Sequence, residues 1–316
     1  MSGGEDGADR SALYRLLGRL FLAEPDAALV GRLREWPAFG EALAGETDGG
    51  AAARLRAEYA RLFLLNVYPY ESVFLDESVM LGAAPSVAVE AAYRAAGFEV
   101  SGVPRPGAAD HVGAELWFAA ALIDGAPAAV QRRFLETHLA AFVAPFAEAV
   151  GRDARHPFYR VLADVTADVV LGDLARLGAA SLPVAAEAGA AETAAPARAS
   201  LRDADLEGVG RYLATPLVAG LFLSRETLHR LAGRLALPLA LLERPRMIEV
   251  LFEGAARFGQ LPALLERLEA EARGAGAYYA ARAAEHRGAA AVLDGWAARA
   301  EATADALVAM RREAAR

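Results

Sequence analysis

The sequence lacks cysteine, and it also lacks lysine, so arginine supplies all 33 of its basic residues. Without cysteine the chain has no disulfide, no cysteine-ligated zinc or iron–sulfur site and no thiol nucleophile. Without lysine it has no Schiff-base residue and no phosphate-loop lysine. Several large classes of enzyme and metalloprotein are therefore excluded before any motif is considered.

Long apolar runs and basic clusters are missing as well. No stretch approaches the ~20 apolar residues of a membrane helix, and residues 1–10 lack the basic and then apolar order of a secretory signal. The formal net charge is −8, and no basic stripe marks a nucleic-acid surface. We therefore expect a cytoplasmic protein with no stable membrane insertion and no nucleic-acid partner.

Apolar residues still make up 55% of the 316 residues, although aromatic residues are only 8% and much of the remainder is alanine. Alanine loses no side-chain entropy in a helix. Apolar side chains recur with helical spacing, and no segment alternates as a strand would. The pattern predicts an all-α protein, with first-half helices at 11–22, 51–65, 85–96, 110–123, 127–142 and 157–171, separated by loops that include 45–50 and 98–109.

Residues 179–200 have no aromatic side chain, are half alanine and are interrupted by Pro183, Gly189 and Pro196. Such composition is typical of a linker. We therefore expect a helical-bundle domain over 1–178 and a second, smaller helical domain over 201–316. In the second domain Ser224 is a predicted helix N-cap, and further helices are predicted at 244–258, 261–273 and 288–313.

Catalytic and metal-binding patterns are weak. A single Glu226-x-x-His229 does not make a di-iron bundle, which needs that pair twice. The sequence has no Gly-x-Ser-x-Gly elbow and no glycine-rich phosphate loop. The adjacent Asp110 and His111 suggest a helical metal-dependent hydrolase, although that class has the order His-Asp and no histidine precedes His111. We predict no catalytic residue, metal or cofactor, and keep such a hydrolase as the alternative.

The other notable polar residues lie in two stretches, an aromatic loop at 70–74 and a helix start at 110–115. In the simplest interpretation, Asp110 is the N-cap of the helix that follows it. His111 and Glu115 then form an i,i+4 pair on the surface. Glu71 and Ser72 make local hydrogen bonds within their loop.

At these same residues the chain resembles the TorD/DmsD/NarJ family of redox-enzyme maturation chaperones. Four segments match in the family's order: Tyr59–Phe63 (YARLF), Pro69–Phe74 (PYESVF), Asp110–Phe118 (DHVGAELWF) and Phe134–Phe142 (FLETHLAAF). Phe74 stands where the family usually has tyrosine, and Phe142 where it usually has tryptophan. The resemblance covers roughly residues 10–178, and the part from 201 onward looks like an extension found in some relatives.

The resemblance implies a chaperone rather than an enzyme. Its client would be a molybdenum-cofactor oxidoreductase, bound through an N-terminal leader, often of the twin-arginine type, until the cofactor is inserted. A cationic, helix-prone leader needs carboxylates beside an apolar groove. The expected binding residues are Tyr70, Glu71, Ser72, Phe74, Asp110, His111, Glu115 and Trp117. Among them, His111 is expected to act as a hydrogen-bonding partner whose charge changes near neutral pH.

The second domain is expected to extend the client contact or to mediate self-association into a homo-oligomer. A plain helical adaptor without leader recognition is the remaining alternative. The sequence leaves open which enzyme is the client and whether that enzyme is exported.

Overall fold

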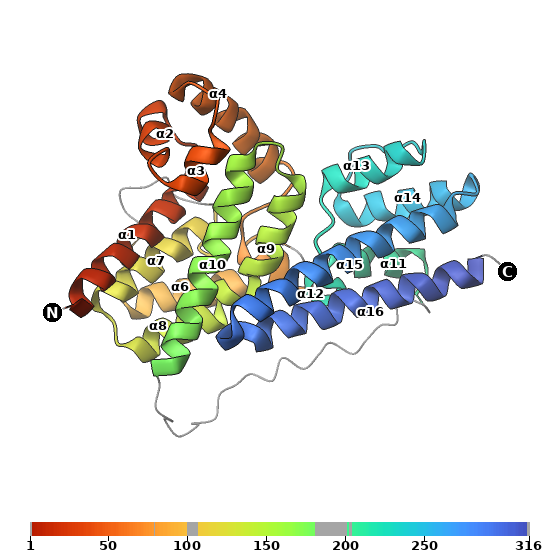
Figure 1. Ribbon diagram of the computed structural model, residues 1–316. Helices are drawn as coiled ribbons and strands as arrows, with labels where there is room; N and C mark the ends of the chain where they lie inside the picture. The colour runs from red at the N-terminus through yellow and green to blue at the C-terminus, as the bar shows by residue number, and fades with distance from the viewer. Residues whose placement is uncertain (1, 79, 100–106, 181–200, 202–203, 315–316) are drawn as a thin grey trace. The chain divides into compact units, whose positions relative to one another are not determined.

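The computed structural model describes residues 2–78, 80–99, 107–180, 201 and 204–314 (Figure 1). Over these residues the chain forms sixteen α-helices and no strand, which confirms the predicted all-α class. One isolated antiparallel bridge joins Tyr70 to His111. None of the described helices has the length and hydropathy needed to span a membrane.

The chain divides into two compact units, Met1–Gly178 and Ala179–Arg316. The predicted linker 179–200 lies outside the described residues from 181 onward. The roles expected for the two parts stay predictions.

The first unit packs its helices around an aromatic core. Helix α1 lies along α7 (Figure 1). Both α5 and α7 contact α9. Phe21 meets Phe146 at a ring-centroid distance of 5.4 Å, and Phe63 meets Tyr159 at 5.4 Å. The helices are α1 (Ser2–Leu22), α2 (Ala27–Leu33), α3 (Pro37–Ala42), α4 (Asp48–Tyr59), the π-helix η1 (Ala60–Leu64), α5 (Glu71–Leu75), α6 (Ala84–Ala95), α7 (Val112–Gly125), α8 (Ala128–Thr137), α9 (Leu139–Asp153) and α10 (Pro157–Ala180).

Several predicted boundaries in this unit are wrong. The helix expected at 11–22 already begins at Ser2, and the helix expected at 157–171 continues to Ala180. The helix expected at 127–142 is broken at His138, whose φ of −117° and ψ of −92° end α8, and α9 then runs on to Asp153. The loop expected at 45–50 is shorter, because the Thr47 hydroxyl accepts a hydrogen bond from Gly50 N (3.2 Å) and starts α4 at Asp48.

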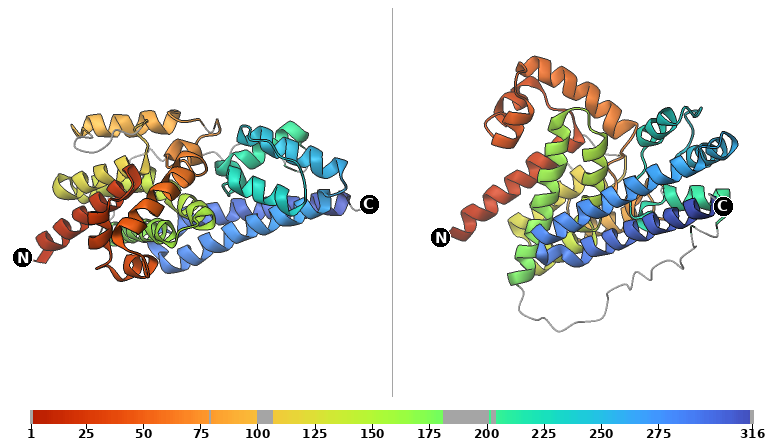
Figure 2. Two further views of the ribbon diagram at one scale, coloured as in Figure 1. Left: turned by 90° about the horizontal axis from the view of Figure 1, so that it is seen from above. Right: turned by 45° about the vertical axis from the view of Figure 1, so that its right-hand side comes forward.

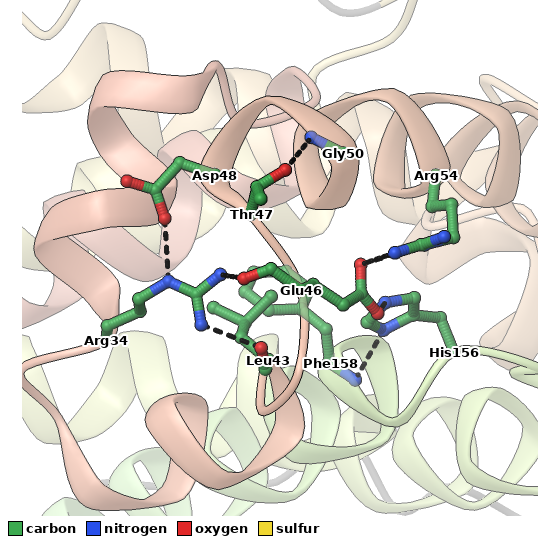
Figure 3. A network of polar contacts seen from close by, with 9 residues as sticks. All are labelled: Arg34, Leu43, Glu46, Thr47, Asp48, Gly50, Arg54, His156 and Phe158. Carbon is green, nitrogen blue, oxygen red and sulfur yellow. Dashed lines mark hydrogen bonds and ion pairs between the residues drawn. The ribbon is translucent and has the colours of Figure 1, made fainter.

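A polar network fixes the turn between α3 and α4 (Figure 3). The Arg34 guanidinium donates to Asp48 Oδ1 (2.7 Å), to the Leu43 carbonyl (2.7 Å) and to the Glu46 carbonyl (2.5 Å). His156 Nε2 lies 3.1 Å from Glu46 Oε1. One planar cation with several N–H groups thus satisfies acceptors from two neighbouring segments.

The second unit is organised on a long antiparallel pair. Helices α15 and α16 lie side by side (Figure 2), and α12 packs on α16. Ser224 caps its helix as predicted, accepting from Thr227 N at 3.0 Å. The helix expected at 261–273 continues to Glu285. The helices are α11 (Leu206–Ala214), α12 (Pro216–Ala219), α13 (Arg225–Arg234), α14 (Arg244–Arg257), α15 (Leu261–Glu285), the short 3-10 helix η3 (Arg287–Ala289) and α16 (Ala290–Ala314).

Candidate functional site

Backbone hydrogen bonds join the two stretches that the sequence singled out. Glu71 N donates to the Asp110 carbonyl (2.9 Å), and Val112 N donates to the Pro69 carbonyl (2.9 Å). Pro69 has no N–H and disfavours helical backbone in the residue before it, so the chain is extended here. The backbone groups on either side of Tyr70 can therefore form hydrogen bonds with residues 110 and 112. The start of α5 is therefore held against the start of α7.

Asp110 caps a helix, but not the one expected. Its Oδ2 accepts a hydrogen bond from Ser72 N at 2.8 Å. Ser72 lies in the first turn of α5, where the N-cap residue Tyr70 makes no side-chain capping bond to the helix. Asp110 thus supplies the missing acceptor from a distant part of the chain, and a carboxylate at a helix N-terminus is favourable.

His111, rather than Asp110, is the N-cap of α7. Its Nδ1 accepts from Gly113 N (3.0 Å), so this nitrogen carries no proton. The ring is 5% exposed, and burial lowers the pKa of His111 to about 3 because the charged form loses its hydration. The expected change of charge near neutral pH is therefore wrong, and so is the surface pair with Glu115, which is fully buried.

Three carboxyl groups and one further imidazole form a buried cluster, which we call the acid cluster. Glu71, Asp110 and Glu115 are 3%, 0% and 0% exposed. His138, at the break between α8 and α9, places Nδ1 3.0 Å from Glu71 Oε2. The cluster thus draws on α5, the residue before the α7 cap, α7 itself and the α8–α9 junction.

The surroundings of Glu115 disfavour its ionised form. Burial raises the pKa of Glu115 well above its usual value, and the charges of Glu71 and Asp110 raise it further. Two ionised carboxylates can only accept hydrogen bonds, whereas a protonated Glu115 can donate to Glu71. Burial also raises the pKa of Glu71, and His138 opposes that effect. Negative charges brought together in one dry site repel one another, and this repulsion acts in the same direction as burial on Glu115.

Several acceptor atoms of the cluster have no donor in the described part of the chain. They are both carboxyl oxygens of Glu115, Asp110 Oδ1 and the Ser72 hydroxyl oxygen. Such buried unsatisfied atoms are uncommon because each costs the free energy of its lost hydration.

Two tyrosines hold the stretch that precedes α7. Tyr93 donates its hydroxyl to the Ala109 carbonyl (3.0 Å), and Gly107 N donates to the Tyr70 hydroxyl (3.3 Å). Burial, followed by the charges of Glu115, Asp110 and Glu71, raises the pKa of Tyr93 well above its usual value. Tyr93 therefore stays a neutral donor beside the acid cluster.

The remaining expected residues have packing positions. Phe74 is fully buried, with ring centroids 6.0 Å from Phe142 and 5.9 Å from Phe146. Trp117 is half-buried and donates Nε1–H to the Arg15 carbonyl at 3.0 Å. The residues that the structure does bring together are Tyr70, Glu71, Ser72, Asp110, His111 and Glu115. Their acidic groups are buried in this conformation instead of lining an open groove.

Sequence reasoning did not select His138 or Tyr93. His138 lies inside a segment quoted for the family resemblance, yet it falls in the middle of a helical pattern, where a histidine is usually unremarkable. Tyr93 sits on the apolar face of α6 and gives no signal of its contact with Ala109. Only the tertiary fold brings these two residues to the cluster.

The alternative of a metal centre at Asp110 and His111 finds no support in the geometry. Among the described residues, neither side chain belongs to a set of three or more His, Asp or Glu ligand atoms lying within 4.8 Å of one another. The Nδ1 of His111 is also already engaged by Gly113 N.

Comparison with known proteins bears on the first unit. Residues 26–148 match the family model described as the nitrate reductase delta subunit. This is a family of molybdoenzyme maturation chaperones of the TorD/DmsD/NarJ type, so the resemblance seen in the sequence is confirmed for this stretch. Members of the family work with molybdoenzyme subunits and are chaperones, not catalytic enzymes. No curated protein matches the chain.

Proposed function

We propose that the protein is a cytoplasmic chaperone that binds the N-terminal leader, of twin-arginine type, or the apo form of a molybdenum-cofactor oxidoreductase. In this role it assists cofactor insertion and delays export until insertion is complete. The proposed binding residues are those predicted from the sequence: Tyr70, Glu71, Ser72, Phe74, Asp110, His111, Glu115 and Trp117.

The observation that supports this proposal most is the convergence of Glu71, Asp110 and Glu115 inside the part of the chain that matches the chaperone family. A leader with a cationic start and a helix-prone apolar stretch is complementary to such a cluster. Because the three carboxyls are buried, binding requires the neighbouring chain to move. Movement of Gly107 and Ala109 would break the two tyrosine hydrogen bonds that hold them beside the cluster.

Calorimetric titration with synthetic leaders tests the proposal. The leaders are taken from molybdoenzymes encoded near the gene, and each is compared with a peptide in which the paired arginines are replaced by glutamine. We expect the arginine-containing leader to bind, and its affinity to fall in Glu71→Gln, in Asp110→Asn and with added salt.

Glu90→Gln is a matched control, because Glu90 is an exposed acid of the same unit that pairs with Arg94 at 2.9 Å. It removes one negative charge without touching the acid cluster, so binding should stay at the wild-type level. If leader affinity falls equally in the control and in Glu71→Gln, the loss comes from the change in net charge and not from the acid cluster. A failure of every leader to bind would contradict the proposal and favour a plain adaptor.

For the second unit we propose an accessory role, either in client contact or in self-association. Hydrogen exchange of the full chain with and without the leader distinguishes these roles. New protection in α11–α16 that appears with the leader supports client contact, whereas protection that depends on protein concentration supports self-association.

A further inference from the structure

The loop that joins α13 to α14 (Figure 1) carries an unbroken apolar run, residues 235–242 (LALPLALL). The first part of the run is fixed to the second unit, because Leu235 and Leu237 are buried. The last part projects from it, since Leu241 is 72% exposed and Leu242 is 39% exposed. Two adjacent leucines exposed to this extent differ from scattered apolar residues and indicate a contact surface.

The loop is held in one conformation before any partner arrives. Ala236 follows the end of α13 with a φ of +52°, in the left-handed region where glycine is the usual residue. Leu237 N donates back to the Ala232 carbonyl at 2.9 Å, and the ring of Pro238 fixes its own φ. A segment that is ordered in advance loses little entropy on binding, which favours association through a small surface.

The backbone of the exposed part is unpaired. Within the described residues, the N–H groups of residues 239–243 donate to no acceptor. Unpaired backbone groups beside exposed apolar side chains can form hydrogen bonds with a second chain that lies along them.

The two ends of the run carry opposite charges. Arg234 is the last residue of α13, and Glu243 is the N-cap residue of α14. Both side chains are exposed, and in the part of the chain that is described neither pairs with an opposite charge. Such a loop is complementary to itself, because two copies related by a two-fold axis bring each arginine to the glutamate of the other copy. A second copy therefore always carries the matching pattern, whereas another partner would have to match it separately.

We propose that residues 234–243 form a self-association surface through which two copies of the chain make a symmetric dimer. Leu241 and Leu242 of the two copies pack together, and Arg234 of each copy pairs with Glu243 of the other. This specifies the self-association role proposed for the second unit and does not require leader binding. The surface offers few side chains, so the dimer is weak and depends on protein concentration.

Sedimentation velocity of the full chain tests the dimer over about a hundredfold range of concentration, in about 0.15 M salt to screen the net charge of −8. We expect the wild type to shift from monomer to dimer. The variant with both Leu241→Ser and Leu242→Ser should dimerise about a hundredfold more weakly, because four leucines per dimer lose their burial. Phe258→Ser is a matched control, since Phe258 is a 56% exposed apolar residue of the same unit outside the loop, and it should dimerise like the wild type.

Exchanging the charges tests the arrangement of the two copies. Arg234→Glu and Glu243→Arg should each weaken self-association about tenfold, because like charges then face each other at both contacts. An equal mixture of the two variants should associate as tightly as the wild type, since opposite charges meet again at both contacts. A mixture that stays as weak as its components would contradict the proposed arrangement.

A wild type that stays monomeric throughout, or a double leucine variant that dimerises like the wild type, would overturn the inference. Thermal melts should show that every variant is folded, because all the changed side chains are exposed. Titration with the leader is a separate measurement. If the dimer forms but no leader binds, this inference stands and the proposed client binding fails; if a leader binds to a chain that is always monomeric, the reverse holds.

Discussion

His111 should make the first unit sensitive to acid. Burial lowers the pKa of His111 from 6.5 to about 3, so the unfolded chain takes up a proton on this ring more readily than the folded chain does. A group whose pKa is lowered on folding contributes its stability above the unfolded value and loses it as the pH falls towards the folded value. The sensitive window therefore extends from pH 6.5 down to about 3.

The size of the effect follows from the shift. Each pH unit within the window corresponds to about 1.4 kcal/mol, so lowering the pH to about 4.5 removes roughly 2.7 kcal/mol from the free energy of unfolding. Solvent screening reduces this little, because the ring is 5% exposed. The cost is a large fraction of the stability of an ordinary domain.

The variant His111→Asn isolates this contribution, because asparagine is a good N-cap that can accept from Gly113 N and does not titrate. The assay is urea unfolding at about pH 7.5 and about pH 4.5, with hydrogen-exchange labelling of α7 reporting the first unit. Loss of packing against Tyr70, whose ring centroid lies 4.9 Å away, lowers the variant's stability equally at both pH values. The wild type should lose more on acidification than the variant does. Parallel losses would refute the assignment of a buried neutral imidazole.

Three further substitutions test the packing. Arg34→Lys should lower the free energy of unfolding by about 1–2 kcal/mol and speed hydrogen exchange at residues 43–48. An ammonium cannot donate to all three acceptors that Arg34 contacts (Figure 3). Unchanged exchange would contradict this prediction. Gly220→Ala should destabilise the second unit by roughly 3 kcal/mol or more, because the position has φ +72° and a Cβ would lie 2.2 Å from Ala300 N; a melting curve like that of the wild type would be the opposing result. Asp110→Ala should lower the free energy of unfolding by about 1–2 kcal/mol and expose the Ser72 amide to hydrogen exchange. A Ser72 amide that stays protected would mean that another group caps α5.

The helical class was predictable because it rests on local properties. Alanine-rich, apolar-periodic segments favour helices wherever they occur, and the caps at Ser224 and the proline-bounded starts are read from neighbouring residues. The break at His138 was not predictable in the same way. No glycine or proline marks the break. His138, whose backbone angles end α8, contacts Glu71, and these two residues are distant in the sequence.

The sequence predicted which residues form the candidate site, but it did not predict that they are buried. The resemblance selected Glu71, Asp110 and Glu115 together, and the structure does bring them together. Charged side chains are rarely fully buried, so sequence reasoning places them at a surface or on the edge of a groove. Their burial follows from the pairing of the chain at Pro69–Glu71 with the chain at Asp110–Val112, which no local pattern specifies. For the same reason the cap formed by Asp110 was assigned to the wrong helix.

The energetics of Glu115 distinguish a structural role from a binding role. A buried carboxyl whose oxygens lack donors within the described residues lowers stability, and an apolar side chain of similar volume avoids that cost. Glu115→Met should therefore raise the free energy of unfolding by about 1–3 kcal/mol near pH 7, measured by urea unfolding with α7 as the reporter. The same variant should lose affinity for the arginine-containing leader. A gain in stability with a loss of binding is the mark of a site kept for its ligand, because functional sites often retain local costs that packing alone would remove. If Glu115→Met is less stable than the wild type, the carboxyl supports the fold instead, and the acid cluster is a structural feature of the first unit.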